Sequence, residues 1–411
     1  MMNKKKLSYP KNKIKVLLLE NIHPISKLIF EREGYKVETI SSSLSDKELI
    51  KKIENISIIG IRSKTKINKK ILLNANRLLA IGAFCIGTNQ VDIDFTKKKG
   101  IIVFNAPFSN TRSVVELVIG QIIFLMRNII EKNKEMHQGI WKKHAAKSFE
   151  IRNKTLGIIG YGNIGSQLSV LAESLGMKVI YYDIKEKLSM GNASRYDSMK
   201  KLIQDSNIIS LHVDGRKDNN NLIDRKEFDW MRKGTVLINY SRGNIVNIDA
   251  LQENIKSGKI AGSSIDVFPS EPSNNQQKFS SKLISLPNTI LTPHIGGSTK
   301  EAQKNIGSYI PSKIIDYINT GATSNSVNFP GLVLPELLNA HRFIHIHKNI
   351  PNVMLKINKV LSEFDINILG QYLKTNNEIG YVITDINQEY NKEVIKKLRE
   401  IDGTIKLRVL Y

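Results

Sequence analysis

Apolar and polar residues alternate along the first third of the chain in a way that predicts strands separated by helices. Strands are predicted at residues 14–19, 35–40, 56–61 and 78–83. The first intervening helix ends at Gly34, and the next starts with the capping-box pattern of Ser45 and Glu48. This alternation predicts a parallel, doubly wound sheet whose ligands lie beyond the carboxyl ends of the strands. Arg62 follows one of those strand ends.

The pattern then changes to one long predicted helix at residues 113–134 and a second strand-and-helix series at residues 155–295. A further helix is predicted at residues 299–318. Past Pro335 the pattern predicts a separate compact unit. Its strands are predicted at 342–347, 367–375, 381–386 and 405–410, and its helices at 353–364 and 393–401. This order of strands and helices is the ferredoxin-like arrangement.

A glycine motif opens the second series. The apolar strand 156–159 runs directly into GYGNIG at residues 160–165, and a helix is predicted from 166 to 175. Gly160 is suited to a tight turn, Gly162 to a close approach of backbone and pyrophosphate, and Gly165 to close packing of helix and strand. The N-terminus of the helix offers free N–H groups to phosphates. The alternative is a chance glycine-rich turn, which the flanking strand and helix argue against.

An acid follows the next predicted strand, residues 178–182. This residue, Asp183, can bind the ribose hydroxyls of NAD and would repel the 2′-phosphate of NADP. Lys185 and Lys187 could tolerate that phosphate, so the preference for NAD is a weaker prediction than the dinucleotide site itself.

Three later loops each follow a predicted strand and carry a residue suited to dehydrogenase chemistry: Arg242, Glu271 and His294. Imidazole can accept a hydroxyl proton near neutral pH, and a neighbouring carboxylate raises its pKa and orients it. Guanidinium binds a substrate carboxylate in a bidentate manner. Each residue alone has an ordinary structural explanation. Together, after a dinucleotide motif, they predict an oxidoreductase that interconverts a 2-hydroxy acid and a 2-oxo acid.

The composition of the chain limits which disulfides, membrane spans and binding partners can be expected. The 411 residues include one cysteine, Cys85, so no intrachain disulfide is possible, and no run is long and apolar enough to predict a membrane span. The Lys-rich start lacks the apolar core of a secretory signal, which predicts a cytoplasmic protein. The net charge of +23 comes from lysines spread over the whole chain, without a nucleic-acid-binding motif. We therefore expect no nucleic acid, no membrane and, for want of ligand spacing, no metal.

Three longer motifs are more discriminating than the glycine loop. They read IGAFCIGTNQVD at 81–92, FNAPFSNTRS at 104–113 and LTPHIGGST at 291–299. With these motifs the chain resembles the D-isomer-specific 2-hydroxyacid dehydrogenase family from Lys13 to Tyr411. The closer likeness is to the short bacterial members that oxidise 3-phosphoglycerate and carry a C-terminal ACT domain.

The resemblance implies three α/β parts. A Rossmann dinucleotide-binding domain is expected at residues 109–297, and a split flavodoxin-like substrate domain at 1–108 and 298–334. A ferredoxin-like ACT domain is expected at 338–411. The implied reaction is NAD-dependent oxidation of 3-phosphoglycerate to 3-phosphohydroxypyruvate, the first step of serine synthesis, with 2-oxoglutarate as a possible second substrate.

The resemblance also assigns residues to roles. Arg242, Glu271 and His294 are the expected catalytic residues, with His294 as acid and base. The expected cofactor-binding residues are Gly160, Gly162, Asn163, Ile164, Gly165, Asp183, Tyr240, Ser241, Arg242, Asp266, His294, Ile295, Gly296 and Gly297. The expected substrate-binding residues are Arg62, Ser63, Lys64 and Asn110. L-serine is the expected effector, on His347, Asn349 and Asn367. Trp141 with Lys142 or Lys143 can reach a neighbouring subunit, and a homotetramer is expected.

Several residues depart from the family pattern. Lys64 stands in place of a second arginine, which keeps the charge but loses the fork. Tyr240 replaces a small residue, so its ring could crowd the cofactor. Asn352 stands where a glycine turns into a helix, and the hinge reads Asn339–Ala340 in place of two glycines. Because losing glycine stiffens a hinge, we hypothesise that serine still binds while inhibition is weakened or lost.

Two other functions fit part of the pattern. A cofactor-sensing corepressor on the same fold could keep Arg242, Glu271 and His294, but the ACT-like unit favours amino-acid metabolism. A dehydrogenase for another 2-hydroxy acid is the second alternative, and Arg62 with the motif around Asn110 argues against it.

Overall fold

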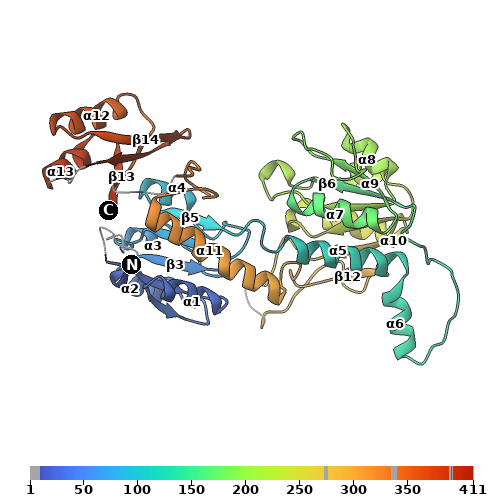
Figure 1. The fold of residues 1–411 in the computed structure, drawn as a ribbon. Helices are drawn as coiled ribbons and strands as arrows, with labels where there is room; N and C mark the ends of the chain where they lie inside the picture. Colours follow the sequence, from blue (N-terminus) through green and yellow to red (C-terminus); the bar gives the residue numbers. More distant parts are fainter. Residues whose placement is uncertain (1–9, 273–275, 335–339, 388–389, 391, 411) are drawn as a thin grey trace. The chain divides into compact units, whose positions relative to one another are not determined.

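The computed structural model describes residues 10–272, 276–334, 340–387, 390 and 392–410. The chain divides into two compact units, Met1–Ser109 with Gln303–Tyr411, and Asn110–Ala302. Each unit is built around its own sheets (Figure 1). Of the predicted hinge, Asn339 lies outside the described residues.

The first unit contains a five-stranded parallel sheet in the order β2-β1-β3-β4-β5. The strands are β1 (Lys15–Leu18), β2 (Lys36–Thr39), β3 (Ile58–Ile61), β4 (Ala80–Ala83) and β5 (Ile102–Asn105). They follow a short turn, η1 (Lys11–Lys13), and alternate with α1 (Ile25–Arg32), α2 (Asp46–Ile53), α3 (Lys69–Leu73) and α4 (Ile93–Lys98). The four predicted strands and the Ser45 capping box are confirmed, while β5, α3 and α4 had not been predicted.

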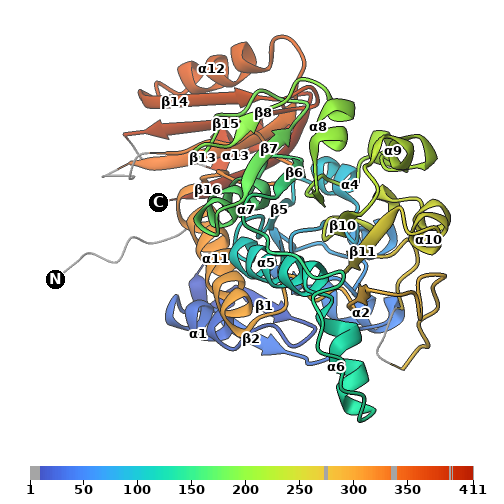
Figure 2. The same ribbon diagram turned by 90° about the vertical axis from the view of Figure 1, so that its right-hand side faces the viewer.

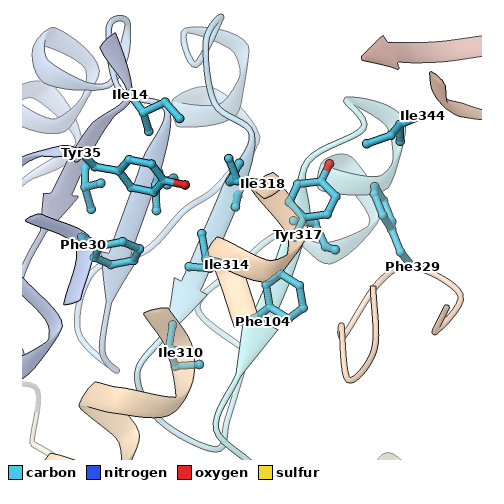
Figure 3. Packing of buried hydrophobic residues seen from close by; sticks show 14 of the residues in the cluster. Ile14, Phe30, Tyr35, Phe104, Ile310, Ile314, Tyr317, Ile318, Phe329 and Ile344 are labelled. Atoms are coloured by element: carbon cyan, nitrogen blue, oxygen red, sulfur yellow. The ribbon is translucent and has the colours of Figure 1, made fainter. Parts of the chain in front are cut away.

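Both faces of this sheet are covered, because odd and even strand residues are apolar alike. Helices α2 and α3 pack on one face, against residues such as Leu17 and Ile59. Helix α1 and the long helix α11 (Lys300–Thr320) pack on the other. Figure 3 shows Ile310, Ile314 and Tyr317 of α11 in the same cluster as Phe104 of β5, whose ring centroid lies 6.3 Å from that of Tyr317. The doubly wound sheet predicted from the apolar pattern is therefore confirmed.

The C-terminal part of this unit is an antiparallel sheet in the order β14-β15-β13-β16. Its elements are β13 (His341–Lys348), α12 (Val353–Glu363), β14 (Ile368–Thr375), β15 (Ile379–Ile386), α13 (Lys392–Glu400) and β16 (Thr404–Leu410). This confirms the ferredoxin-like order. The two helices cover one face, and the other face packs on the cluster that contains α11 (Figure 2).

The second unit is a seven-stranded parallel sheet in the order β12-β11-β10-β9-β6-β7-β8. Its strands are β6 (Thr155–Ile159), β7 (Lys178–Tyr182), β8 (Ser194–Arg195), β9 (Ile208–Leu211), β10 (Thr235–Asn239), β11 (Ile260–Ile265) and β12 (Thr289–Leu291). Its helices are α5 (Thr111–Met126), α6 (Ile129–His137), α7 (Asn163–Ser174), α8 (Met199–Asp205), α9 (Arg225–Trp230) and α10 (Ile248–Lys256), with short turns η2 (Lys217–Asn219) and η3 (Gly243–Ile245).

These helices form two layers. Helices α5 and α7 pack on one face of the sheet, and α8, α9 and α10 pack on the other. Because all seven strands are parallel, their carboxyl ends meet at one edge, where the glycine loop and the loops of Arg242 and His294 are found. The fold therefore gathers the predicted dinucleotide and catalytic segments within one unit.

The prediction of a single long helix at residues 113–134 is wrong. The structure has two helices, α5 and α6, bent by 68° relative to each other. Asn128 between them has φ 52°, a left-handed conformation that asparagine tolerates better than most residues and that ends a helix. Among the described residues no single helix is long and apolar enough to cross a membrane, although this bent pair meets the length and composition criteria jointly.

Candidate active site

The glycine loop between β6 and α7 has the geometry that each glycine was predicted to supply. Gly160 has φ +94°, and a Cβ atom there would lie 2.5 Å from the carbonyl oxygen of His212. A Cβ atom at Gly165 would collide with the carbonyl oxygen of Gly160, so only glycine lets α7 start this close to the strand. At Gly162 no atom lies within 4 Å of the Cβ position. The loop thus combines open space with the N-terminus of a 12-residue helix, a site that fits a pyrophosphate.

Asp183 follows β7 and is fixed beside this loop. Its Oδ2 accepts a 2.8 Å hydrogen bond from the backbone N–H of Tyr161, and its Oδ1 accepts a 2.9 Å bond from that of Lys185. The carboxylate is only partly buried. An acid held at the end of β7, the second strand of the Rossmann unit along the chain, matches the ribose-binding position of an NAD site.

His294 and Glu271 form the expected pair. The distance from His294 Nδ1 to Glu271 Oε2 is 2.9 Å, and Glu271 Oε1 accepts a 3.1 Å bond from the N–H of Phe268. Glu271 raises the pKa of His294 through this hydrogen bond, while burial opposes the rise. Burial alone would raise the pKa of the Glu271 carboxyl. The hydrogen bonds from His294 and Phe268 outweigh burial, so this pKa is lowered. The His294 side chain is about half exposed, so its ring can meet a substrate.

Asp266, at the end of β11, holds the loop that carries His294. Its Oδ1 accepts bonds from the Thr292 hydroxyl at 2.6 Å and the Ile295 N–H at 2.8 Å. Its Oδ2 accepts a 2.8 Å bond from the Gly296 N–H. Burial raises the pKa of Asp266, although these three donors oppose it. The loop needs this support because His294 has φ 55°, a strained value for a residue other than glycine.

Arg242 lies after β10, in a loop organised by Asn239. The Asn239 side chain accepts bonds from the Ser241 N–H at 3.1 Å and hydroxyl at 2.7 Å, and donates to the Arg242 carbonyl at 3.0 Å. Among the described residues, the guanidinium donates one hydrogen bond, from Nη1 to the Ser241 carbonyl at 2.7 Å. Its remaining N–H groups are sufficient for a bidentate contact to a carboxylate.

Tyr240 has its side chain in the interior. Only 6% of the residue is exposed, its ring belongs to the apolar cluster under the sheet, and its hydroxyl lies 3.0 Å from Ser264 Oγ. Burial raises the pKa of this hydroxyl. The ring also lies against Gly296, where a Cβ atom would come within 3.2 Å of it. A contact of Tyr240 with the cofactor would therefore fall mainly to its backbone.

The loop of Arg62, Ser63 and Lys64 belongs to the first unit and is held by a buried acid. Glu20 accepts bonds from the backbone N–H groups of Arg62 at 3.2 Å, Lys64 at 2.9 Å and Thr65 at 2.8 Å. The Arg62 carbonyl accepts a further bond from the Gln90 side chain at 2.7 Å. These bonds hold the backbone of the loop, while Arg62 is partly buried and Lys64 is exposed.

Asn110 lies in the second unit, where its side chain packs against Gly297. Its Oδ1 is buried and has no hydrogen-bond partner among the described residues. Ser113 Oγ and Thr299 Oγ1, 2.8 Å apart, tie the start of α5 to the segment after Gly297. The structure therefore brings Asn110 to the His294–Gly297 loop, as a shared site requires.

The three expected serine-binding residues do not come together within one chain. His347 is at one end of β13 and is buried against Gly380, and Asn349 follows it. Asn367 precedes β14, whose first residue, Ile368, lies across Ile386 from His341 at the other end of β13. A site with all three would need a second copy of the chain. Asn352 has φ 70° and so takes the turn where glycine was expected.

Several supporting residues had not been predicted, including Glu20, Asn239 and Thr292. Each acts through hydrogen bonds to loops that hold the predicted residues, and polar residues of this kind give no periodic signal in a sequence. His212 after β9 had not been predicted either: burial lowers the pKa of its imidazole to about 3, and its Nε2 lies 2.8 Å from Ser210 Oγ. Trp141, expected to reach another subunit, is 77% exposed.

Comparisons with known proteins agree with this architecture. Residues 119–296 match the NAD-binding domain of the D-isomer specific 2-hydroxyacid dehydrogenases, and residues 343–406 match the AHAS small subunit-like ACT domain. D-3-phosphoglycerate dehydrogenase of Dictyostelium discoideum is 51% identical, covering 98% of this chain and 99% of that protein. The Escherichia coli K12 protein of that name is 46% identical, covering 99% and 100%.

Solved structures give the same class. The structure of D-2-hydroxyisocaproate dehydrogenase matches with a TM-score of 0.69 and 25% identity, covering 77% of this chain and all of that one. The NAD-complexed D-isomer specific 2-hydroxyacid dehydrogenase of Lactobacillus delbrueckii ssp. bulgaricus matches with a TM-score of 0.66 and 25% identity, covering 76% and 100%.

Fold, glycine loop and relatives together define an NAD-dependent oxidoreductase with a Rossmann domain and an ACT domain. Within that class, the chain belongs to the D-3-phosphoglycerate dehydrogenases of the D-isomer specific 2-hydroxyacid dehydrogenase family. The predicted resemblance, fold class and cofactor are thereby confirmed.

Proposed function

We propose that the chain oxidises 3-phospho-D-glycerate to 3-phosphohydroxypyruvate with NAD, as the first step of L-serine biosynthesis, and reduces 2-oxoglutarate to 2-hydroxyglutarate as a second activity. The observation that carries the proposal is the His294–Glu271 pair on the Rossmann edge, in a chain whose full-length relatives bear this enzyme's name.

His294 moves the proton. Because Nδ1 is bonded to Glu271, Nε2 is the ring nitrogen left to face the substrate 2-hydroxyl. Nε2 takes the hydroxyl proton during oxidation, and the Glu271 carboxylate stabilises the imidazolium that forms. NAD, held by the glycine loop and Asp183, would supply the acceptor for the hydride of C2. Arg242 orients the substrate carboxylate through its free N–H groups, which fixes C2 and its hydroxyl relative to His294.

The substrate phosphate falls to the cationic loop of the first unit. Arg62 offers a planar fork and Lys64 a point charge, and the buried Glu20 keeps their backbone fixed. Asn110, whose buried Oδ1 has no hydrogen-bond partner among the described residues, is the polar side chain beside the His294–Gly297 loop that we assign to the substrate. Because Lys64 stands in place of an arginine, we expect weaker phosphate binding than two guanidinium groups would give.

Serine regulation and assembly are part of the same proposal. His347 and Asn349 lie at one end of the ACT sheet and Asn367 at the other, so an effector that uses all three is bound between two copies. Trp141, largely exposed on the segment after α6, offers a further contact between subunits. We propose a homotetramer that binds serine at paired ACT domains.

The test follows NADH loss by absorbance with 3-phosphohydroxypyruvate, 2-oxoglutarate, pyruvate and glyoxylate offered in parallel. We expect the highest kcat/KM with 3-phosphohydroxypyruvate, and a loss of about 10²-fold or more in His294→Asn. A preference for pyruvate or glyoxylate would contradict the substrate assignment. NADH binding without activity on any of the four would instead favour a cofactor-sensing binding protein.

A further inference from the structure

The segment that follows Asp183 is an exposed loop that is held from beneath by buried side chains. Residues 184–192, all within the described part of the chain, form neither helix nor strand, and each of them is exposed. This 184–192 loop connects β7 to β8 and begins directly after the acid that matches the ribose-binding position. Because such a loop lacks the regular backbone hydrogen bonds of a helix or strand, its conformation depends on the side chains that it contacts.

Tyr161, the second residue of the glycine motif, is bonded to Asp183 and to the far end of this loop. Its backbone N–H donates to Asp183 Oδ2 at 2.8 Å, and its hydroxyl oxygen accepts a 3.1 Å bond from the N–H of Met190. Ser169 Oγ on α7 donates its own proton to a carbonyl of that helix, so the Tyr161 hydroxyl is the donor in their 2.7 Å contact. One side chain, in a residue only 2% exposed, thus links the glycine loop, α7 and the 184–192 loop.

Tyr181 of β7 supports the same loop beside Tyr161. The two rings are stacked, with centroids 3.7 Å apart and planes inclined by 18°. The Tyr181 hydroxyl donates to the Lys187 carbonyl at 2.8 Å, so Ser189 Oγ, 3.0 Å away, is the donor to the Tyr181 oxygen. Two buried rings therefore present two hydroxyls to the loop, and both hydroxyls bond to residues in its second half.

We propose that Tyr161 is a positioning residue of the cofactor site, whose hydroxyl keeps the Asp183 carboxylate oriented for the adenosine ribose by fixing the loop that follows it. The proposal rests on the cofactor placement of the proposed function. The second donor to Asp183, the N–H of Lys185, belongs to the loop itself, so the carboxylate keeps both bonds only while the loop stays in place. An acceptor that is already oriented binds more tightly, because less conformational freedom is lost on binding.

The test compares the binding of NADH with that of its 2′-deoxyadenosine analogue, which lacks the hydroxyl assigned to Asp183. Both are titrated by their fluorescence, without substrate. Tyr161→Phe keeps the stacked ring and removes the hydroxyl. It is expected to raise the Kd for NADH about fivefold, the usual contribution of one hydrogen bond, and the Kd for the analogue less than about twofold. Tyr196→Phe is the matched control and should change neither Kd, because its hydroxyl donates to Asp205 at 3.2 Å on the other face of the sheet.

Equal weakening of NADH and the analogue in Tyr161→Phe would overturn the proposal, because the hydroxyl would then only brace the fold. So would a Kd for NADH that changes no more than it does in Tyr196→Phe. Asp183→Ala checks the premise: it should remove most of the preference for NADH over the analogue, and a preference that survives would also overturn the proposal. NADH oxidation with 3-phosphohydroxypyruvate reports separately on the proposed function, since the titrations contain no substrate.

Discussion

At the scale of single residues, the two carboxylates near His294, those of Glu271 and Asp266, differ in burial and in the direction of their pKa shifts. The Glu271 side chain is 36% exposed and bonded to imidazole, and the pKa of its carboxyl is lowered. Asp266 is 2% exposed, bonded to a hydroxyl and two backbone N–H groups, and its pKa is raised. Glu271 therefore acts on the charge of His294, while Asp266 acts on the position of its loop.

Glu271→Gln should move the pH dependence of the reaction to lower pH. Reduction of the 2-oxo acid needs protonated His294, so kcat/KM falls as pH rises through the His294 pKa. That pKa is raised by Glu271, and the neutral amide removes the charge responsible. We expect the fall to begin at lower pH than in the unaltered protein, as read from kcat/KM for 3-phosphohydroxypyruvate at saturating NADH.

Glu253→Gln serves as the control, because Glu253 is an exposed acid of the same unit that pairs with Arg225. Its profile should match that of the unaltered protein. An unchanged midpoint in Glu271→Gln, with only a lower rate, would mean that Glu271 positions the ring without setting its pKa.

At the scale of elements, the ACT sheet is anchored to the C-terminal end of α11. Arg342, Tyr381 and Arg408 donate to the carbonyls of residues 320, 321 and 318, at 2.9, 2.7 and 3.3 Å. Cationic donors suit the last carbonyls of a helix, which have no partner within it. Arg342 is fully buried and also makes two bonds with Asp385, at 2.6 and 2.7 Å.

Arg342→Met should therefore destabilise the C-terminal half of the first unit. It leaves the buried Asp385 carboxylate and the Thr320 carbonyl without their donor, at a cost of about 3 kcal/mol or more. The expected result is a lower urea midpoint for the full chain, followed by circular dichroism. Arg342→Met combined with Asp385→Leu should recover part of the loss, because no unpaired charge remains.

Lys397→Met is the comparison variant. Lys397 pairs with Glu363 at 3.3 Å on the surface of the same part, and its loss should cost no more than about 0.5 kcal/mol. Equal midpoints for Lys397→Met and Arg342→Met would show that the buried pair does not hold the ACT sheet on α11.

The same elements show what a sequence can and cannot predict. Periodicity located most strands and the ACT order, since burial of one face leaves a regular apolar pattern. It failed at Asn128, where a single left-handed residue splits an apolar run into α5 and α6. The motifs named both His294 and Asp266, the latter as a cofactor-binding residue, but they did not predict that Asp266 and Thr292 support the His294 loop, because those bonds depend on how loops fold together. Glu20, bonded 42 or more residues away, left no local signal at all.

At the scale of the whole molecule, the ACT domain is coupled to its own chain over a broad surface. Ile344, Ile346 and Ile383 are fully buried in the cluster that also contains α11. Lys97 and Glu378, 2.8 Å apart, add an ion pair at the side. We therefore expect a domain anchored in this way, with Asn339–Ala340 in place of two glycines, to have little freedom to rotate when an effector binds.

L-serine is therefore expected to bind without strong inhibition. Binding would be measured by calorimetry and inhibition by NADH oxidation with 3-phosphohydroxypyruvate, over one range of serine concentration. Residual activity above about half at saturating serine would agree with weakened transmission, since a ligand shifts an equilibrium only by its differential affinity for the two states. Replacing Asn339 and Ala340 by glycine should restore inhibition without changing the serine Kd, because glycine widens the accessible backbone conformations. Inhibition of the unaltered chain by more than about half at saturating serine would contradict this, and would show that the signal passes through the anchored face itself.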